Sequence, residues 1–307
     1  MSHSHTYSGN PLARGERERR DEDWITAMIK DPTSKFLPMN DLNVPVSEGS
    51  QEGLLWLSAD ELERFGGYKG VYLLGILDGV ACHVVDVSGN GQTMLDPGDR
   101  GEYRYVDART AAETLSGADS GIVAQARAQV DWHNRHGYCS TCGHETIVRR
   151  GGQMRQCPIC DALHYPRTDP VVIAVVSDND RCLLGQTRGR ATQTNRFSAL
   201  AGFVDQGESI EEAVAREVME EAGIAVKNVR YHSSQPWPFP SSLMIGCHAE
   251  AVTTRIAMDD EEMSDIRWFH RDEVLKALEG RSEKLAVPGP TAIAHHIIKA
   301  WAANEAP

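Results

Sequence analysis

The chain has 307 residues, of which 41% are hydrophobic and 24% are charged, and its formal net charge is −13. This composition is typical of globular proteins, and the length is enough for two or three domains. The acidic balance argues against a broad electrostatic grip on nucleic acid, and no apolar run is long enough to predict a membrane span. Because the first 23 residues also lack the apolar core of a signal peptide, we expect a cytoplasmic protein without a membrane partner.

Residues 1–133 are expected to form an amino-terminal α/β module. Residues 24–37 have the pattern of an amphipathic helix, the short apolar runs 54–57, 71–76 and 80–87 favour strands, and residues 107–115 and 121–133 favour helices. No catalytic constellation stands out in this module. Cys82 and His83 lie within an apolar run, so we expect both in the core.

Residues 134–166 contain two CxxC pairs separated by fourteen residues, Cys139 with Cys142 and Cys157 with Cys160. Four thiolates around one ion match tetrahedral Zn²⁺ and leave no position open, which predicts one structural zinc ion per chain. Two disulfides or a redox CxxC are the alternatives; disulfides are disfavoured without a secretion signal, and redox chemistry needs only one pair.

Other cysteines and histidines near these pairs have simpler interpretations. His144 and His164 lie close by in the sequence, but four cysteines already complete the site, so neither is expected to be a ligand. Cys182 and Cys247 fall in apolar stretches and are expected to be buried thiols.

Residues 167–307 are expected to form a third domain built on a mixed sheet with helices on both faces. Residues 170–177 favour a buried strand that returns through 181–186 as a hairpin, and further strands are expected at 226–232, 243–252 and 266–269. Helices are expected near 271–278 and 291–302.

Within this domain, residues 202–224 carry the densest pattern. Ser209 followed by Glu212 predicts a capped helix that ends at Gly223. Val214, Val218 and Ala222 would form its buried stripe. The neighbouring face carries three carboxylates at helical spacing, on Glu217, Glu220 and Glu221, and Arg216 is spaced to pair with Glu212 and Glu220.

Two interpretations of the three carboxylates stay open on spacing alone. They could form a solvated acidic helix face, which is common. Alternatively, they could hold Mg²⁺ or Mn²⁺ beside a phosphate-containing substrate, since these ions take carboxylate ligands with water in the remaining positions.

The full spacing resembles the Nudix box. Gly202, five residues, Glu208, seven residues, Arg216-Glu217, two residues, Glu220-Glu221, one residue and Gly223-Ile224 match every defining position. The resemblance implies an α/β/α sandwich that uses divalent metal to hydrolyse a nucleoside diphosphate linked to another group. It favours the metal-binding interpretation of the carboxylates.

The segment from Ser234 to Met244 follows the box and alternates prolines with aromatic residues. Proline fixes φ and removes backbone donors, so this loop is expected to be stiff and extended. It could be a rigid structural loop, or it could present Trp237 and Phe239 as a wall for a flat aromatic ligand.

The Nudix box, the preceding four cysteines and the SQPWPFP stretch together resemble the NADH pyrophosphatase (NAD⁺ diphosphatase) branch of the Nudix superfamily. That branch cleaves the diphosphate of NADH to give reduced nicotinamide mononucleotide and AMP, and bacterial members also remove NAD caps from RNA. The resemblance implies a homodimer that uses two or three Mg²⁺ or Mn²⁺ ions.

The same resemblance assigns roles to residues. It implies the following set: catalytic residues Arg216, Glu217, Glu220 and Glu221; metal ligands Glu217, Glu221, Glu262 and the carbonyl of Ala201; and substrate-binding residues Tyr165, Phe203, Gln235, Pro236, Trp237, Pro238, Phe239, Pro240, Ser241, Ser242 and Ala294. Ser241 departs from the pattern, because many relatives carry glutamine there.

Three further functions remain as alternatives. The substrate could be another nucleoside diphosphate derivative, such as a dinucleoside polyphosphate or ADP-ribose. The relevant substrate could instead be the 5′ end of NAD-capped RNA. The protein could also sense nucleotides without turnover, although relatives of that kind usually lose box glutamates and none is lost here.

Overall fold

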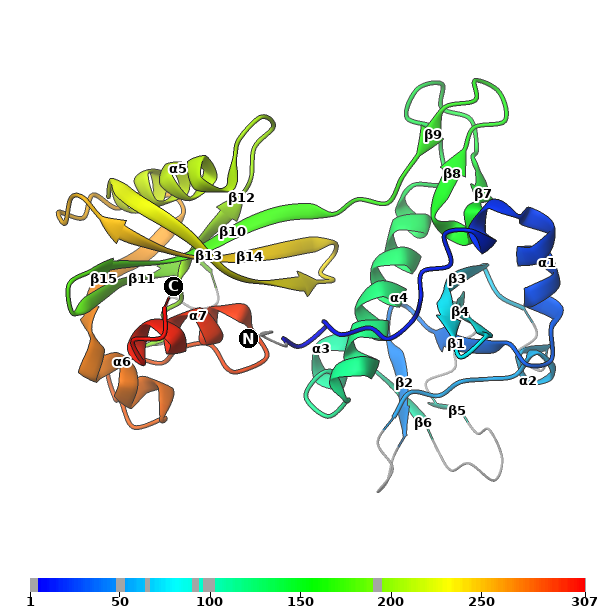
Figure 1. Ribbon diagram of the computed structural model, residues 1–307, viewed down its shortest axis with the longest axis horizontal. Coiled ribbons are helices and arrows are strands. Elements are labelled where there is room, and N and C mark those ends of the chain that lie inside the picture. The colour runs from blue at the N-terminus through cyan, green and yellow to red at the C-terminus, as the bar shows by residue number, and fades with distance from the viewer. Residues whose placement is uncertain are drawn as a thin grey trace. The chain divides into compact units, whose positions relative to one another are not determined.

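The computed structural model describes residues 5–47, 53–63, 67–89, 94–95, 103–189 and 195–306 (Figure 1). Within these ranges the chain forms two compact units. The amino-terminal unit comprises residues 6–167 and 237–241, and the carboxy-terminal unit comprises His5 with residues 168–236 and 242–306. The boundaries expected at 133/134 and 166/167 stay predictions. None of the described helices combines the length and apolarity needed to cross a membrane.

Among its described residues, the amino-terminal unit contains one long helix, several short ones and three small sheets, ordered β1-β4-β3, β2-β6-β5 and β7-β8-β9. Its elements are η1 (Glu18–Arg20), α1 (Glu22–Lys30), β1 (Lys35–Met39), β2 (Val44–Ser47), α2 (Ala59–Glu63), β3 (Gly70–Leu77), β4 (Val80–Asp86), β5 (Met94–Leu95), β6 (Tyr103–Val106), α3 (Ala108–Ala111), α4 (Gly117–Arg135), β7 (Ile147–Arg149), η2 (Arg150–Gly152), β8 (Met154–Gln156) and β9 (Leu163–His164).

The core of this unit lies on both faces of the β1-β4-β3 sheet. One face packs Leu37 and Val84 against Ile122 and Val130 of α4. The other face packs a second cluster that includes Phe36 and Val85. Burial on both faces explains why these strands read as nearly continuous apolar runs. Cys82 and His83 are buried, as predicted.

The expectation of one helix over residues 24–37 is wrong. The helix α1 ends at Lys30, and residues 35–39 form β1, which pairs in parallel with β4. Pro32 explains the break, because the residue before a proline is disfavoured in the helical region. Two other elements are shorter than expected: α3 covers only Ala108–Ala111, and the run 54–57 forms isolated bridges rather than a strand.

The carboxy-terminal unit is built on a six-stranded mixed sheet. The strand order is β13-β14-β10-β11-β15, with β12 also paired to β10. The strand β14 runs parallel to β10, whereas β11 and β12 run antiparallel to it. Its elements are β10 (Asp169–Asp178), β11 (Arg181–Thr187), β12 (Leu200–Phe203), α5 (Ile210–Ala222), β13 (Val226–Trp237), β14 (Ser242–Ala251), β15 (Met263–His270), α6 (Arg271–Leu278) and α7 (Ile293–Ala302).

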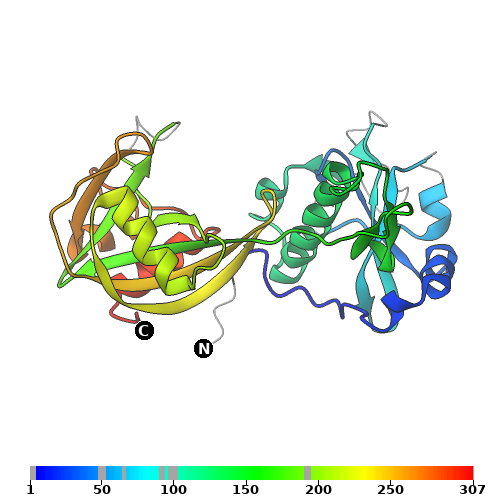
Figure 2. The ribbon, with the colours of Figure 1, turned by 90° about the horizontal axis from the view of Figure 1, so that it is seen from above.

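This sheet is covered by helices on both faces, which confirms the expected sandwich. Alternate residues of β10 point to opposite faces. Val172 and Ala174 pack in the cluster that contains α5, while Ile173 and Val175 pack in the cluster that contains α7. Figures 1 and 2 show α5 and α7 on opposite sides of the sheet.

Candidate functional site

The helix α5 begins and ends where its sequence predicts. The Ser209 hydroxyl accepts from the backbone N–H of Glu212 at 3.2 Å, and the Glu212 carboxylate accepts from the backbone N–H of Ser209 at 2.8 Å. These two bonds form a capping box that satisfies donors at the free end of the helix. At the other end, Gly223 has φ +67°, a conformation that glycine adopts without strain. The buried stripe of Val214, Val218 and Ala222 is confirmed.

Arg216 joins three acidic residues of the box into one network. Its guanidinium donates to the two carboxylate oxygens of Glu208 at 2.6 and 2.9 Å, to Glu217 at 2.8 Å and to Glu220 at 2.9 Å. It also donates to the carbonyl oxygen of Phe203 at 2.8 Å. A planar guanidinium is suited to such forked bonding, which a lysine could not reproduce.

The expected pairing of Arg216 with Glu220 is confirmed, whereas the carboxylate of Glu212 is used in the capping box instead. Arg216 makes two of its hydrogen bonds to Glu208. Because Glu208 precedes the helix, the spacing of residues along a helix does not predict this contact. Hydrogen bonds from Arg216 lower the pKa of Glu208 to about 2. The same carboxylate bonds raise the pKa of Arg216, so the pair stays charged at any physiological pH.

The carboxylate of Glu217 lies directly against the backbone of β12. A methyl group placed on Gly202 would come within 1.9 to 2.1 Å of the Glu217 carboxyl atoms. No side chain can therefore replace the hydrogen at Gly202 without displacing that carboxylate. This close approach explains the glycine at the start of the box and brings Glu217 beside the Ala201–Gly202 backbone.

Glu221 is the most unusual acid of the group. It is 5% exposed, its Oε2 has no hydrogen-bond partner in the part of the chain that the structure describes, and its other contact is with the backbone N–H of Ala201. Burial raises the pKa of Glu221 to about 8, with further contributions from the charges of Glu217 and Glu262. Burial likewise raises the pKa of Glu217.

Glu262 reaches this group from a distant part of the sequence. The loop before it is fixed to the end of α5, because Asp259 donates its backbone N–H to the Glu221 carbonyl at 3.1 Å and Ala257 donates to Ala222 at 2.8 Å. A cluster of carboxylates that raise each other's pKa, with one buried oxygen unpaired, has the donor chemistry of a divalent cation site. Their donor chemistry therefore fits the metal that the sequence implies, although among the described residues only the four cysteines bring three or more ligand atoms within 4.8 Å of one another.

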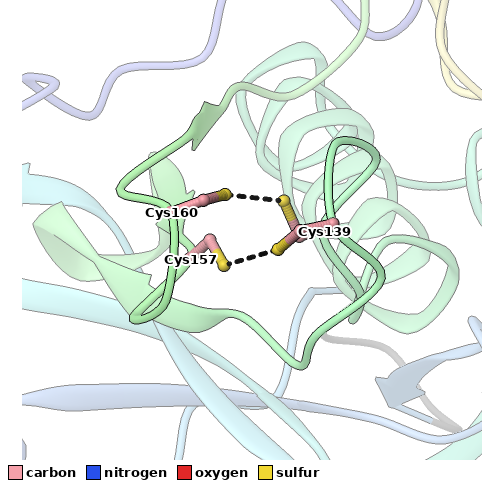
Figure 3. A group of neighbouring side chains, drawn as sticks. Cys139, Cys157 and Cys160 are labelled. Atoms are coloured by element: carbon pink, nitrogen blue, oxygen red, sulfur yellow. Dashed lines mark hydrogen bonds between the residues drawn. The ribbon is translucent and has the colours of Figure 1, made fainter.

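The four cysteines also converge. Their Sγ atoms all lie within 4.8 Å of one another, with 3.6 Å between Cys139 and Cys160 and 3.4 Å between Cys142 and Cys157 (Figure 3). A tetrahedral ion with Zn–S bonds of about 2.3 Å needs sulfurs about 3.8 Å apart, so the geometry fits a structural zinc centre. His164 is not part of the cluster, but its Nε2 lies 3.3 Å from Cys139 Sγ, a contact that orients a ligand from outside.

The segment that carries the four cysteines and strands β7 to β9, a zinc ribbon, is fixed to the helix α4 by buried polar groups. Arg155 donates to the Thr146 side chain and carbonyl at 2.6 and 2.7 Å and lies 3.1 Å from His133 Nδ1. His133 Nε2 lies 2.9 Å from the Gly152 carbonyl oxygen, so this nitrogen carries the proton. Burial lowers the pKa of His133 to about 4, which keeps the ring neutral between its two partners.

The predicted substrate residues are divided between the two units. Phe203, Gln235, Pro236, Ser242 and Ala294 belong to the carboxy-terminal unit; Tyr165, Trp237, Pro238, Phe239, Pro240 and Ser241 belong to the amino-terminal unit. Phe203 and Tyr165 are largely exposed, whereas Gln235 and Ala294 are buried. Their contact with substrate stays a prediction.

Three family models match the chain in sequence. They are the NADH pyrophosphatase-like rudimentary NUDIX domain over residues 33–132, the NADH pyrophosphatase zinc ribbon domain over 134–165 and the NUDIX domain over 167–287. The family models, the sandwich fold and the four close cysteines thus define a Nudix hydrolase with a zinc ribbon.

Similarity to curated proteins shows to which branch of the Nudix hydrolases the chain belongs. The chain is 48% identical to the NAD-capped RNA hydrolase NUDT12 of Macaca fascicularis over 96% of this chain and 72% of the relative. It is 40% identical to the NAD-capped RNA hydrolase NudC of Mycobacterium bovis over 76% of this chain and 75% of the relative, and 42% identical to the mitochondrial NAD(P)H pyrophosphatase NUDT13 of Mus musculus over 64% and 59%. The chain belongs to the NADH pyrophosphatase family of Nudix hydrolases.

Proposed function

We propose that this protein hydrolyses the diphosphate of NADH and NAD⁺ to nicotinamide mononucleotide and AMP, and that it also removes NAD caps from RNA. In this reaction the oxygen of water bonds to one phosphorus while the bridging P–O bond breaks, and the bridging oxygen leaves with the other phosphate. The relatives named for NAD-capped RNA and NAD(P)H support this choice of substrate.

The observation that carries the proposal is the environment of Glu221. A buried carboxylate with an unpaired oxygen, beside Glu217 and close enough to Glu262 to feel its charge, is costly unless a cation is bound there. Glu217, Glu221, Glu262 and the carbonyl of Ala201 would hold Mg²⁺ or Mn²⁺. When bound, these ions neutralise diphosphate charge and lower the pKa of the attacking water.

The chain's own residues supply orientation and proton transfer. Arg216 holds Glu217 and Glu220 in place through bonds of 2.8 and 2.9 Å, so that neither carboxylate has to be ordered during turnover. Glu221 must lose its proton when a cation binds. We expect substitution of Glu221 to reduce turnover more than any other single substitution, because Glu221 would serve both as a metal ligand and as the base. Glu220 is the alternative base.

The proposal also covers the oligomeric state of the protein, its location in the cell and its zinc content. We expect a homodimer, which size-exclusion chromatography with light scattering would test. A cytoplasmic location also forms part of the proposal and would be tested by cell fractionation. The four cysteines would give one zinc ion per chain, which metal analysis of the purified protein would measure.

A substrate panel tests the proposal. Purified protein would be given Mg²⁺ or Mn²⁺ with NADH, NAD⁺, ADP-ribose and a diadenosine polyphosphate, and kcat/KM would be compared across the set. The proposal predicts the highest kcat/KM for NADH or NAD⁺. A preference for ADP-ribose or the diadenosine polyphosphate would contradict it, and absence of turnover with every compound would favour a nucleotide sensor.

A further inference from the structure

The proline-aromatic segment from Gln235 to Ser242 is fixed at both ends by other residues of the chain. The chain passes from the carboxy-terminal unit into the amino-terminal unit at Trp237 and returns at Ser242. Each end has its own set of contacts. These contacts indicate which side chains of the segment are free to touch a ligand.

Two arginine side chains lie over the ring of Phe239. The guanidinium carbon of Arg109 lies 3.8 Å from the ring centroid, and that of Arg127 lies 4.6 Å from it. Both distances are within the range of cation–π attraction. Arg127 also donates through Nη1 to the carbonyl oxygen of Pro238, the residue before Phe239. Two guanidinium groups therefore lie over the Phe239 ring.

Tyr7 and the backbone of Arg109, which lie beside Phe239, are held by bonds within the amino-terminal unit. Tyr7 meets the ring edge-on with centroids 5.8 Å apart, and its hydroxyl donates to the Ala108 carbonyl at 3.0 Å. Arg109 follows Asp107, whose carboxylate accepts the Arg109 backbone N–H at 2.8 Å. Phe239 itself packs on the core of the amino-terminal unit. The ring thus behaves as an anchor.

The other end of the segment is fixed within the carboxy-terminal unit. The side-chain amide of Gln235 is fully buried; it donates to the Thr291 carbonyl at 2.9 Å and accepts from the Ile293 backbone N–H at 2.8 Å. These two bonds attach the end of β13 to the start of α7. Both ends of the segment are therefore tied to protein groups.

The sheet register connects this segment with the Nudix box. On the two sides of β10, Val171 is paired with Met244 of β14 and with Phe203 of β12. Ser242 lies two residues before Met244, so the segment joins the sheet near the end at which Phe203 and the box begin. The segment is therefore continuous along the chain with the strand edge near which the box begins.

We propose that Phe239 is a positioning residue, held by Arg109 and Arg127, and does not stack on the nicotinamide or adenine ring. Arg127 thereby sets the affinity for the dinucleotide without touching it. This inference rests on the proposed function, in which the segment borders the substrate. It replaces the expectation that both aromatic side chains of the segment form a ligand wall.

A double-mutant cycle between Arg127 and Phe239 tests the inference. Arg127→Ala and Phe239→Leu should each raise KM for NADH about three- to tenfold and leave kcat within about twofold, since both release the same contact. The double variant should match the larger single effect, because coupled residues are not additive. Arg127→Lys, which keeps a donor for Pro238, should restore part of the affinity. Arg135→Ala, an exposed arginine on the same helix, is the matched control and should keep wild-type KM.

The inference would be wrong if the Arg127 and Phe239 substitutions changed KM independently of each other. If the two single increases in KM multiply in the double variant, or if Arg127→Ala keeps wild-type KM, Phe239 acts on the substrate by itself. Should Arg127→Ala fail to fold, Arg109→Ala, whose side chain is exposed, replaces it in the cycle. Should the wild type not hydrolyse NADH, the proposed function fails first, and the same cycle is then measured on Kd for NADH from its fluorescence.

Discussion

Replacing Glu221 by Gln is expected to stabilise the metal-free protein while it abolishes turnover. The wild-type carboxyl is buried, and its pKa is about 8 in the folded protein against an ordinary value of 4.5. A group whose folded-state pKa is raised binds more protons in the folded state, so stability falls as pH rises from the unfolded to the folded pKa. Glutamine has nearly the same shape and never ionises, so it avoids this cost.

The size of the effect follows from the two pKa values. Between pH 5.5 and 8.5, the cost of keeping Glu221 in the folded protein grows by at most about 3 kcal/mol, at about 1.4 kcal/mol per pH unit. Relaxation of the surrounding loop reduces this figure, so we expect the Gln variant to gain about 1–3 kcal/mol relative to wild type across this window. Near pH 4.5 and below, the two proteins should differ little.

Denaturant unfolding with a metal chelator of low zinc affinity, measured at several pH values, checks this. Glu211→Gln, which removes an exposed carboxylate from the first turn of the same helix, is the control and should show no such pH-dependent gain. A stability difference of the same size at pH 5.5 and pH 8.5, or none at either, would refute the argument that burial keeps Glu221 protonated.

Three other substitutions should distinguish residues needed for catalysis or metal binding from residues needed for folding. Arg216→Lys loses the forked bonds that order the carboxylates and should lower kcat/KM about 10- to 100-fold with little unfolding, whereas the exposed Arg230→Lys should be neutral in the same assay. Gly202→Ala displaces the Glu217 carboxylate and should weaken Mn²⁺ binding, seen by titration calorimetry; unchanged affinity would contradict the close approach. Cys157→Ser should lose the zinc ion and unfold the ribbon, seen by metal analysis and limited proteolysis; an intact ribbon without zinc would contradict a structural role.

Features set by neighbours in the sequence were predictable. The capping box of α5 depends on residues three apart, and Gly223 ends the helix by its own backbone freedom. The zinc centre could be predicted because each cysteine pair is a local turn. The sandwich followed from the order of apolar runs, which the observed sheet confirms.

Features set by distant contacts were not predictable. Residues 35–37 were expected at the end of a helix but belong to β1, where pairing with β4 buries Phe36 and Leu37 on opposite faces. The bond between Arg216 and Glu208 crosses from loop to helix, where helical spacing gives no signal. Arg127 precedes Phe239 by 112 positions, and only the folded chain brings the two together.

The identity of the products is the most direct test of diphosphate hydrolysis by this protein. NADH would be incubated with the purified protein and Mg²⁺ or Mn²⁺, and the products would be separated by chromatography, with Glu221→Gln as the inactive control. We expect equal amounts of reduced nicotinamide mononucleotide and AMP from the wild type, and neither product from the variant. Release of nicotinamide or of free phosphate, or the same products from Glu221→Gln at wild-type rate, would contradict hydrolysis of the diphosphate at this site.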